Sequence, residues 1–130
     1  MTNIVEKWGP SFILFNSLGI VLFALCGALM PTEFWGLLNV DSVHLEFTRI
    51  MGWYLFVFGL GGLIVWRNPQ RQPAVVMLIG LEKIAPAILF PLLTLEKGAH
   101  WLVLAIGIFD GLMAVLCIWY SLWLTRRGTV

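Results

Sequence analysis

Residues 74–95 read AVVMLIGLEKIAPAILFPLLTL, an apolar stretch with a glutamate and a lysine, Glu82 and Lys83, near its middle. A helix needs roughly 20 mainly apolar residues to cross about 30 Å of hydrocarbon, and this stretch is long enough. Strand-like alternation is absent, and only helices or closed barrels satisfy their backbone hydrogen bonds in lipid. We expect four transmembrane helices, because similar apolar stretches cover residues 12–30, 50–66 and 101–124.

The composition excludes a water-soluble protein. The chain has 130 residues, of which 60% are hydrophobic and 12% charged, whereas about a quarter of the residues in soluble domains are charged. Its formal net charge of +1 provides no basic surface for nucleic acid. Cys26 and Cys117 form no CxxC pattern and have no histidine at metal-ligand spacing, so we expect both to fill the core. Residues 1–130 are expected to form a single membrane domain.

The connections predict how the helices are arranged. Short connections favour an up-down bundle of antiparallel helices. Basic residues are enriched in cytoplasmic segments, and those near the helix ends gather on one side of the expected membrane, so both termini are expected in the cytoplasm. The longer 31–48 connection then faces outward, and its apolar 34–38 segment is expected on the outer bilayer surface. The basic residues in question are Lys7, Arg67, Arg71, Arg126 and Arg127.

Glu82, Lys83 and Asp110 fall inside the expected membrane helices. Each costs roughly 2.5–3.5 kcal/mol at membrane depth. Lys83 lies about 13 Å from the expected cytoplasmic surface of the membrane, and Asp110 lies about 13 Å from the opposite surface. In a hydrocarbon core of about 30 Å their depths differ by only a few Å, so their side chains are within reach of each other. Glu82 lies about 100° away around the helix, so one partner cannot easily serve both residues. The sequence leaves open whether Glu82 faces another helix, a water cavity or a neighbouring subunit, or is protonated. We expect these three residues to form an intramembrane polar site, and Asn16 and Ser17 to hydrogen-bond between helices.

Two prolines follow these charges in the third helix. Pro86 and Pro91 cannot donate hydrogen bonds to the carbonyls four residues before them, which predicts kinks in the third helix. Broken helices beside buried charge recur at transporter binding sites, but a bent helix locked by an ion pair fits the same residues. The sequence leaves both readings open. Gly107 and Gly111 have the GxxxG spacing of closely packed membrane helices.

The outer end carries two weaker groups of candidates. Arg49 begins the second apolar stretch and Glu46 lies about one turn before it, which suits an ion pair within the helix. A site where Arg49 binds an anionic head group is the alternative. His44 and His100 fall on the same side and are the candidates for a metal or haem site. Because they lack HxxxH or HxxE spacing, we expect no metal there.

Several positions match a pattern of short motifs. The motifs are Arg49-x-x-Gly52, Gly59, Arg67-x-Pro69-x-Arg71, Gly80-Leu81-x-Lys83 and Asp110. Over about residues 49–120 the chain thereby resembles small bacterial four-helix membrane proteins of the DoxX-like group and neighbouring uncharacterised families. The resemblance implies a helical bundle in the bacterial inner membrane and Arg49, Lys83 and Asp110 as its shared polar positions. DoxX-like proteins have been linked to terminal oxidases and to thiol or oxidative-stress complexes, so the resemblance implies no single reaction.

Three functions suit these features. The favoured hypothesis is an accessory or scaffold subunit that packs in the lipid bilayer against other membrane subunits or a second copy of itself. A dimeric proton-coupled transporter would use Glu82, Lys83 and Asp110 as its relay. A lipid- or quinone-binding protein would use the same residues as its polar site, and no other cofactor is expected. The absence of a nucleophile–base arrangement or a phosphate-binding loop argues against an enzyme without deciding the question.

Overall fold

The computed structural model describes residues 2–40 and 45–128, and all regular elements within these residues are helical. Four helical stretches are long and apolar enough to cross a membrane, which confirms the expected number; they cover Ile4–Leu29, Thr48–Val65, Pro73–Lys97 and Trp101–Gly128. The elements are α1 (Thr2–Leu29), α2 (Pro31–Leu37), α3 (Leu45–Val65), the 3-10 turn η1 (Pro69–Arg71), α4 (Pro73–Glu82), α5 (Ile84–Lys97) and α6 (Trp101–Gly128).

Prolines and one glycine set several of the helix ends. α2, η1 and α4 each begin at a proline, where the missing N–H is not needed and the fixed φ suits the first turn. α5 ends before Gly98, which has a φ of 68°. That left-handed conformation favours glycine and lets the N–H of Ala99 donate to the carbonyl of Leu93 at 3.2 Å. The turn into α6 is therefore tight.

α1 extends further towards the N-terminus than the apolar stretch at residues 12–30 indicated. It begins at Thr2 and continues through Pro10. The charged residues Glu6 and Lys7 lower the hydropathy of this segment, but Val5 is buried and Gly9 lies against the ring of Tyr120 in α6. An apolar stripe thus continues past the charged residues and holds the first turns against α6.

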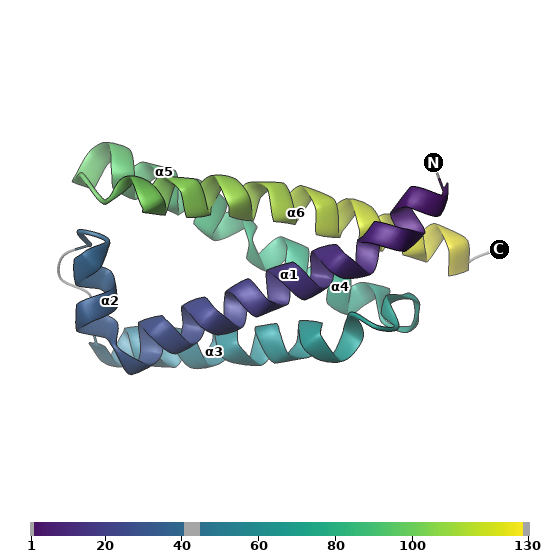
Figure 1. The fold of residues 1–130 in the computed structure, drawn as a ribbon, viewed down its shortest axis with the longest axis horizontal. Helices are drawn as coiled ribbons and strands as arrows, with labels where there is room; N and C mark the ends of the chain where they lie inside the picture. The colour runs from purple at the N-terminus through teal and green to yellow at the C-terminus, as the bar shows by residue number, and fades with distance from the viewer. Residues whose placement is uncertain (1, 41–44, 129–130) are drawn as a thin grey trace.

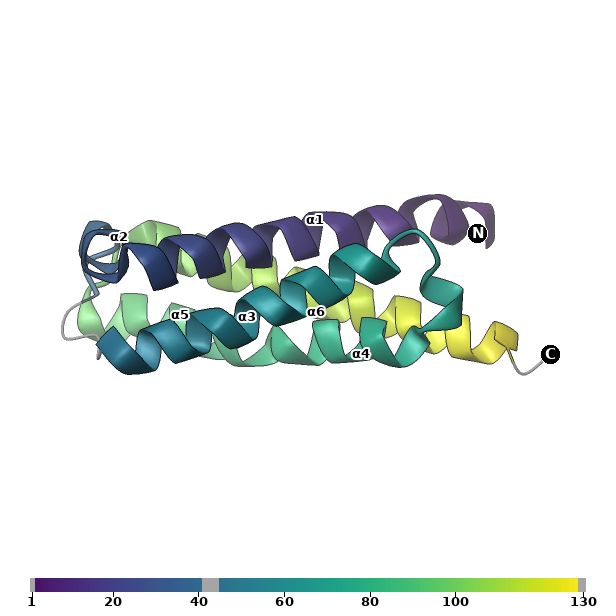
Figure 2. The same cartoon turned by 90° about the horizontal axis from the view of Figure 1, so that it is seen from below.

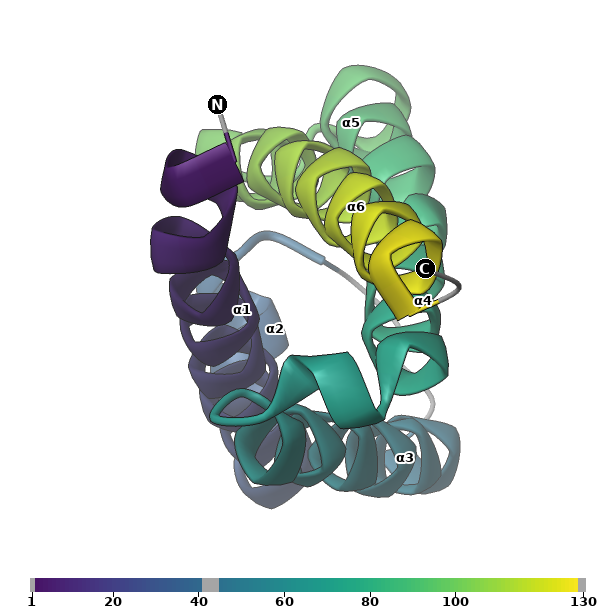
Figure 3. The same ribbon diagram turned by 90° about the vertical axis from the view of Figure 1, so that its right-hand side faces the viewer.

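The helices form two layers, with α1 against α3 and with α4 and α5 against α6 (Figure 1). Figure 2 shows α4 and α5 following α6 along its length. Viewed from the end that carries both termini, the membrane-length helices surround a common centre (Figure 3). At this end Glu6 forms an ion pair with Arg127, and the hydroxyl of Ser121 donates to the carbonyl of Pro73 at 2.6 Å. The Glu6–Arg127 ion pair thus ties the two layers together near the termini, while the Ser121–Pro73 bond holds α4 to α6 within one layer. Figure 1 shows the layers separating towards α2.

Glycines bring α1 and α3 close together. Gly52 faces Ala28, while Gly59 and Gly62 face the backbone or side chain of Ser17. A Cβ at Gly59 would lie 3.2 Å from the carbonyl oxygen of Ser17. Small residues allow this approach, which gains dispersion contacts in a membrane where the hydrophobic effect does not drive helix pairing. The α1–α3 layer therefore depends on these glycines.

α2 packs against the protein, and the expected position of its apolar 34–38 segment on the outer bilayer surface stays a prediction. Its Phe34 ring meets Phe23 of α1 edge-on, with the centroids 5.2 Å apart. Leu38 is buried against Ala99 and Val103. The carbonyl of Leu38 also accepts a hydrogen bond from the N–H of His100 at 2.8 Å. These contacts connect the α1–α2 end to the α5–α6 turn.

The glycine contact yields a stability prediction. Gly59→Val should lower the free energy of unfolding by about 1–3 kcal/mol, because the new side chain must push α1 away. Gly61→Val is the matched control, since a Cβ at Gly61 meets no atom within 4 Å. Unfolding by sodium dodecyl sulfate in mixed micelles measures both. Equal effects of the two substitutions would contradict the glycine-dependent contact.

Candidate functional site

The third membrane-length helix is broken in its middle, at Lys83. α4 ends at Glu82 and α5 begins at Ile84, while Lys83 connects them with φ −74° and ψ −12°. Pro86 cannot donate a hydrogen bond to the carbonyl of Glu82, and its ring crowds that carbonyl. The N–H of Lys83 instead donates to the carbonyl of Gly80 at 3.2 Å, as in a 3-10 turn. Pro86 was expected to kink the backbone beside Glu82 and Lys83, and the helix is interrupted there, three residues before Pro86.

Pro91 has a different effect, because α5 continues through it. Its ring lies against Gly107 of α6, where a Cβ would come within 2.6 Å of Cδ of Pro91. One turn further along α6, a Cβ at Gly111 would meet the side chain of Ala87 at 3.5 Å. Gly107 and Gly111 therefore face α5, and the bulk of the proline ring fits where α6 has no side chain.

The close α5–α6 contact aligns three charged groups. Nζ of Lys83 lies 3.0 Å from Oδ1 of Asp110 and 3.9 Å from Oε2 of Glu82. The side chains of Lys83 and Asp110 are 10% and 6% exposed, and that of Glu82 is 14% exposed. Lys83 is within hydrogen-bond distance of Asp110 alone. Oε2 of Glu82 is buried and has no hydrogen-bond partner among the residues described.

Asn16 of α1 adds a fourth polar group. It is completely buried, and its Nδ2 makes a long contact of 3.9 Å as donor to Sγ of Cys117 in α6. Its Oδ1 finds no hydrogen-bond partner in the described part of the chain. Neighbouring Ser17 donates instead to the carbonyl of Ile13 within α1, at 2.6 Å. The expectation that both residues bond between helices is thus wrong for Ser17, because a carbonyl one turn away satisfies its hydroxyl.

These polar groups line an apolar cavity of about 470 Å³ between the two layers. All four membrane-length helices contribute to its wall. The polar lining consists of Asn16, Glu82, Lys83 and Asp110, and Tyr54 also lines the cavity. The remaining lining residues are apolar: Gly19, Ile20, Phe23, Met51, Leu55, Phe58, Ala85, Pro86, Leu89, Phe90, Ile106 and Phe109.

The cavity reaches the side of the molecule that would face lipid. α4 packs on α3, but α5 diverges from α3 beyond the break at Lys83 (Figure 1). Tyr54 on α3 and Leu89 on α5 line the cavity and are 59% and 56% exposed. Among the described residues, this α3–α5 edge is therefore a lateral access route at the depth of the charged groups.

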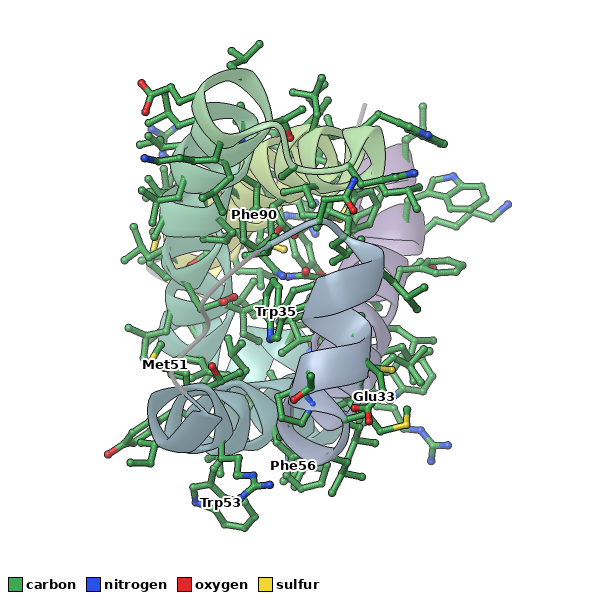
Figure 4. All side chains as sticks on the ribbon, turned by 90° about the vertical axis from the view of Figure 1, so that its left-hand side faces the viewer. Glu33, Trp35, Met51, Trp53, Phe56 and Phe90 are labelled. Carbon is green, nitrogen blue, oxygen red and sulfur yellow. The ribbon has the colours of Figure 1, made fainter. Side chains whose placement is uncertain are left out.

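Aromatic rings close the cavity towards α2. Phe23 and Phe90 belong to the cavity wall and lie 5.9 Å apart between ring centroids. Trp35 of α2 stacks edge-on against Phe23 at 5.6 Å. Figure 4 shows Trp35 and Phe90 turned into the space between the helices, in contrast to Trp53, which points outward. Nε1 of Trp35 is buried, and the described residues offer it no hydrogen-bond acceptor.

The other candidates from the sequence lie away from this cavity. Arg49 is exposed on α3. His44 and the side chain of Glu46 lie outside the described residues. Nδ1 of His100 accepts from the N–H of Leu102 at 3.2 Å, so this histidine helps to begin α6. The described residues contain no group of three or more histidine, cysteine or acidic side chains positioned to hold a metal ion.

Comparisons with protein-family models, with curated proteins and with solved structures find no match to this chain. The resemblance to the DoxX-like group therefore stays a prediction, and the function must be argued from the site itself. Fold alone would not supply it, because one fold serves many functions.

The buried ion pair yields the second prediction. Asp110→Ala should lower the free energy of unfolding by about 3–5 kcal/mol, because it removes the carboxylate at hydrogen-bond distance from buried Lys83 and leaves only the more distant Glu82 as its counter-ion. Replacing all three charged residues with Asp110→Leu, Lys83→Met and Glu82→Leu should restore most of that loss, since apolar residues of similar size often replace buried ion pairs without penalty. Titration with sodium dodecyl sulfate again provides the measurement. A triple variant as unstable as Asp110→Ala would show that these residues act through more than their mutual charges.

Proposed function

We propose that this chain is a multi-pass membrane protein that binds a lipid-soluble molecule carrying a polar group. One observation carries the proposal: an apolar cavity of about 470 Å³ with four buried or nearly buried polar side chains in its wall. Ligand cavities usually measure about 300–1,000 Å³ and combine apolar walls with a few convergent polar groups. This cavity has both properties.

The position of the polar groups supports a ligand over a purely structural role. An ion pair between Lys83 and Asp110 is sufficient to lock two helices, and a lock needs no cavity beside it. A third charged side chain, Glu82, and an open space next to it raise the cost of the fold without adding to that lock. Binding of a ligand in the cavity would account for both Glu82 and the open space next to it.

The exposed α3–α5 edge supports a ligand that comes from the bilayer. A lipid or a quinone can place its apolar tail between Tyr54 and Leu89 and its polar head beside Lys83. Transport would require a second access route, and an accessory subunit would not require the cavity at all. We retain the accessory subunit as the second proposal, because the apolar outer faces of the four helices also suit packing against other membrane proteins.

We further propose that the helices form an up-down antiparallel bundle in a bacterial inner membrane, with both termini in the cytoplasm. The supporting pattern is a basic end marked by tryptophans. Arg127 stacks over Trp123 at 4.2 Å near the C-terminus, and Arg67 stacks over Trp66 at 5.3 Å at the α3–α4 turn. Paired tryptophans and arginines suit the cytoplasmic interface of a membrane.

Labelling of single cysteines tests the orientation. In a background with Cys26→Ala and Cys117→Ala, Lys97→Cys should react with a membrane-impermeant maleimide in intact cells. Gln70→Cys should react only after permeabilisation, because it lies at the basic end. Both positions are exposed, so each is accessible from its own side. The reverse pattern would place the termini outside.

Saturable photolabelling tests the ligand site. A dodecanol with a diazirine in its chain should label the cavity residues of the protein in phosphatidylcholine nanodiscs. Gly19→Leu should reduce labelling at saturation by about tenfold, because Gly19 lines the cavity and a Cβ there meets no atom within 4 Å, which leaves room for the new side chain to enter the cavity.

Gly61→Leu is the matched control, since Gly61 lies outside the cavity and has equal free space around its Cβ. It should label like the unaltered protein. Labelling that never saturates, or that is unaffected by Gly19→Leu, would contradict a ligand site in the bundle and favour the accessory-subunit proposal.

A further inference from the structure

We infer that the cavity selects a lipid-soluble cation whose head group donates hydrogen bonds, such as a primary long-chain amine. This inference names the ligand class of the proposed function and rests on it. It depends on the balance of charge and of hydrogen-bonding groups in the cavity wall.

The charges in the wall do not cancel. The lining contains one cation, Lys83, and two carboxylates, Glu82 and Asp110. Lys83 lies at hydrogen-bond distance from Asp110, 3.0 Å, and is 0.9 Å further from Glu82, at 3.9 Å. No other charged side chain lines the cavity within the described residues. Glu82 therefore shares Lys83 with Asp110 and has no counter-ion at hydrogen-bond distance among the lining residues described, and a cationic ligand head would supply one.

The unpaired hydrogen-bonding groups have the same preference. Oε2 of Glu82 and Oδ1 of Asn16 are buried oxygens without a partner in the described structure, and both residues line the cavity. Both oxygens are acceptors. Asn16 is completely buried, so a donor can reach its Oδ1 only from within the protein or the cavity. A head group with N–H donors is complementary to these two acceptors.

The same charges and hydrogen-bonding groups disfavour ligands with an anionic head and ligands whose head only accepts hydrogen bonds. The ammonium group of Lys83 is the strongest donor in the wall, and Asp110 already accepts from it. A carboxylate or phosphate head would have to displace Asp110 and would lie beside Glu82, so like charges would repel. The carbonyl groups of an oxidised quinone are acceptors and would leave both buried oxygens unpaired. An uncharged alcohol donates one hydrogen bond and falls between these cases.

The apolar wall is also suited to a cation. The rings of Tyr54, Phe58 and Phe109 line the cavity, and aromatic faces attract ammonium groups in sites with little water. The apolar chain of an amine can leave through the α3–α5 edge, where Leu89 is exposed. A single molecule can thus satisfy the polar groups and fill the apolar part of the cavity.

Competition among three twelve-carbon ligands tests this inference. Dodecylamine, dodecanol and dodecanoate share one chain and differ in the head group, and each competes with the photoreactive dodecanol for the protein in phosphatidylcholine nanodiscs. Dodecylamine should compete about tenfold better than dodecanol, as expected for charge-assisted hydrogen bonds to a buried acceptor. Dodecanoate should compete least. Dodecanol or dodecanoate competing as well as the amine would overturn the inference.

Variants locate the preference. Glu82→Gln should reduce the advantage of the amine over the alcohol to about threefold or less, because the countercharge is gone. Glu82→Asp should retain most of it, and Glu96→Gln, at an exposed position outside the cavity, should leave it unchanged. Asn16→Leu should weaken amine binding and leave dodecanol binding less affected. An amine advantage that survives Glu82→Gln in full would overturn the assignment to Glu82.

The two proposals fail differently in this experiment. Saturable dodecanol binding without an amine preference supports the cavity as a ligand site but overturns the cationic ligand class. Competition by none of the three ligands overturns both. The order of the ligands on the unaltered protein decides the inference even where a Glu82 variant does not fold.

Discussion

The ion pair between Lys83 and Asp110 is the interaction on which the arrangement of the helices depends. Two opposite charges 3.0 Å apart at membrane depth are tolerable only together, since either one alone would be very costly in hydrocarbon. The pair therefore fixes the register of the third membrane-length helix against α6. Gly107 and Gly111 make this register feasible, because they let Pro91 and Ala87 approach α6 closely.

The break at Lys83 has a second consequence, which is the cavity. An unbroken helix packed against α3 at one end would stay near α3 along its length. The interruption lets α4 contact α3 while α5 follows α6 (Figure 1). The layers consequently separate towards α2, and side chains from Phe23, Trp35 and Phe90 close only the end of that space. Helix geometry, ion pairing and cavity formation are thus parts of one arrangement.

Local sequence patterns predict some of these features well. Hydropathy identifies the four membrane-length helices, because apolar length is the property that a bilayer requires. Depth along neighbouring helices brings Lys83 and Asp110 to the same level, since the rise per residue is fixed. The start of α1 was missed because Glu6 and Lys7 mask a narrow apolar stripe, which only its packing against Tyr120 reveals.

The cavity could not be predicted in this way, because its size depends on the distance between helices that are far apart in sequence. Asn16 illustrates the difficulty. A buried asparagine in a membrane helix usually indicates a bond to a neighbouring helix, and only the structure shows that its oxygen is left unpaired beside an open space.

The feature of the sequence that did point to this site is Glu82. In a regular helix its neighbour Lys83 would point elsewhere, so a second carboxylate is hard to explain as part of one structural pair. Glu82 is nearly buried, at 14% exposure, and lines the cavity beside the pair of Lys83 and Asp110. An excess charge in a membrane protein carries a continuous energetic cost. A bound cation that enters from the lipid would remove this cost, which is the physical reason to look for the function at Glu82 and not at the pair that holds the helices together.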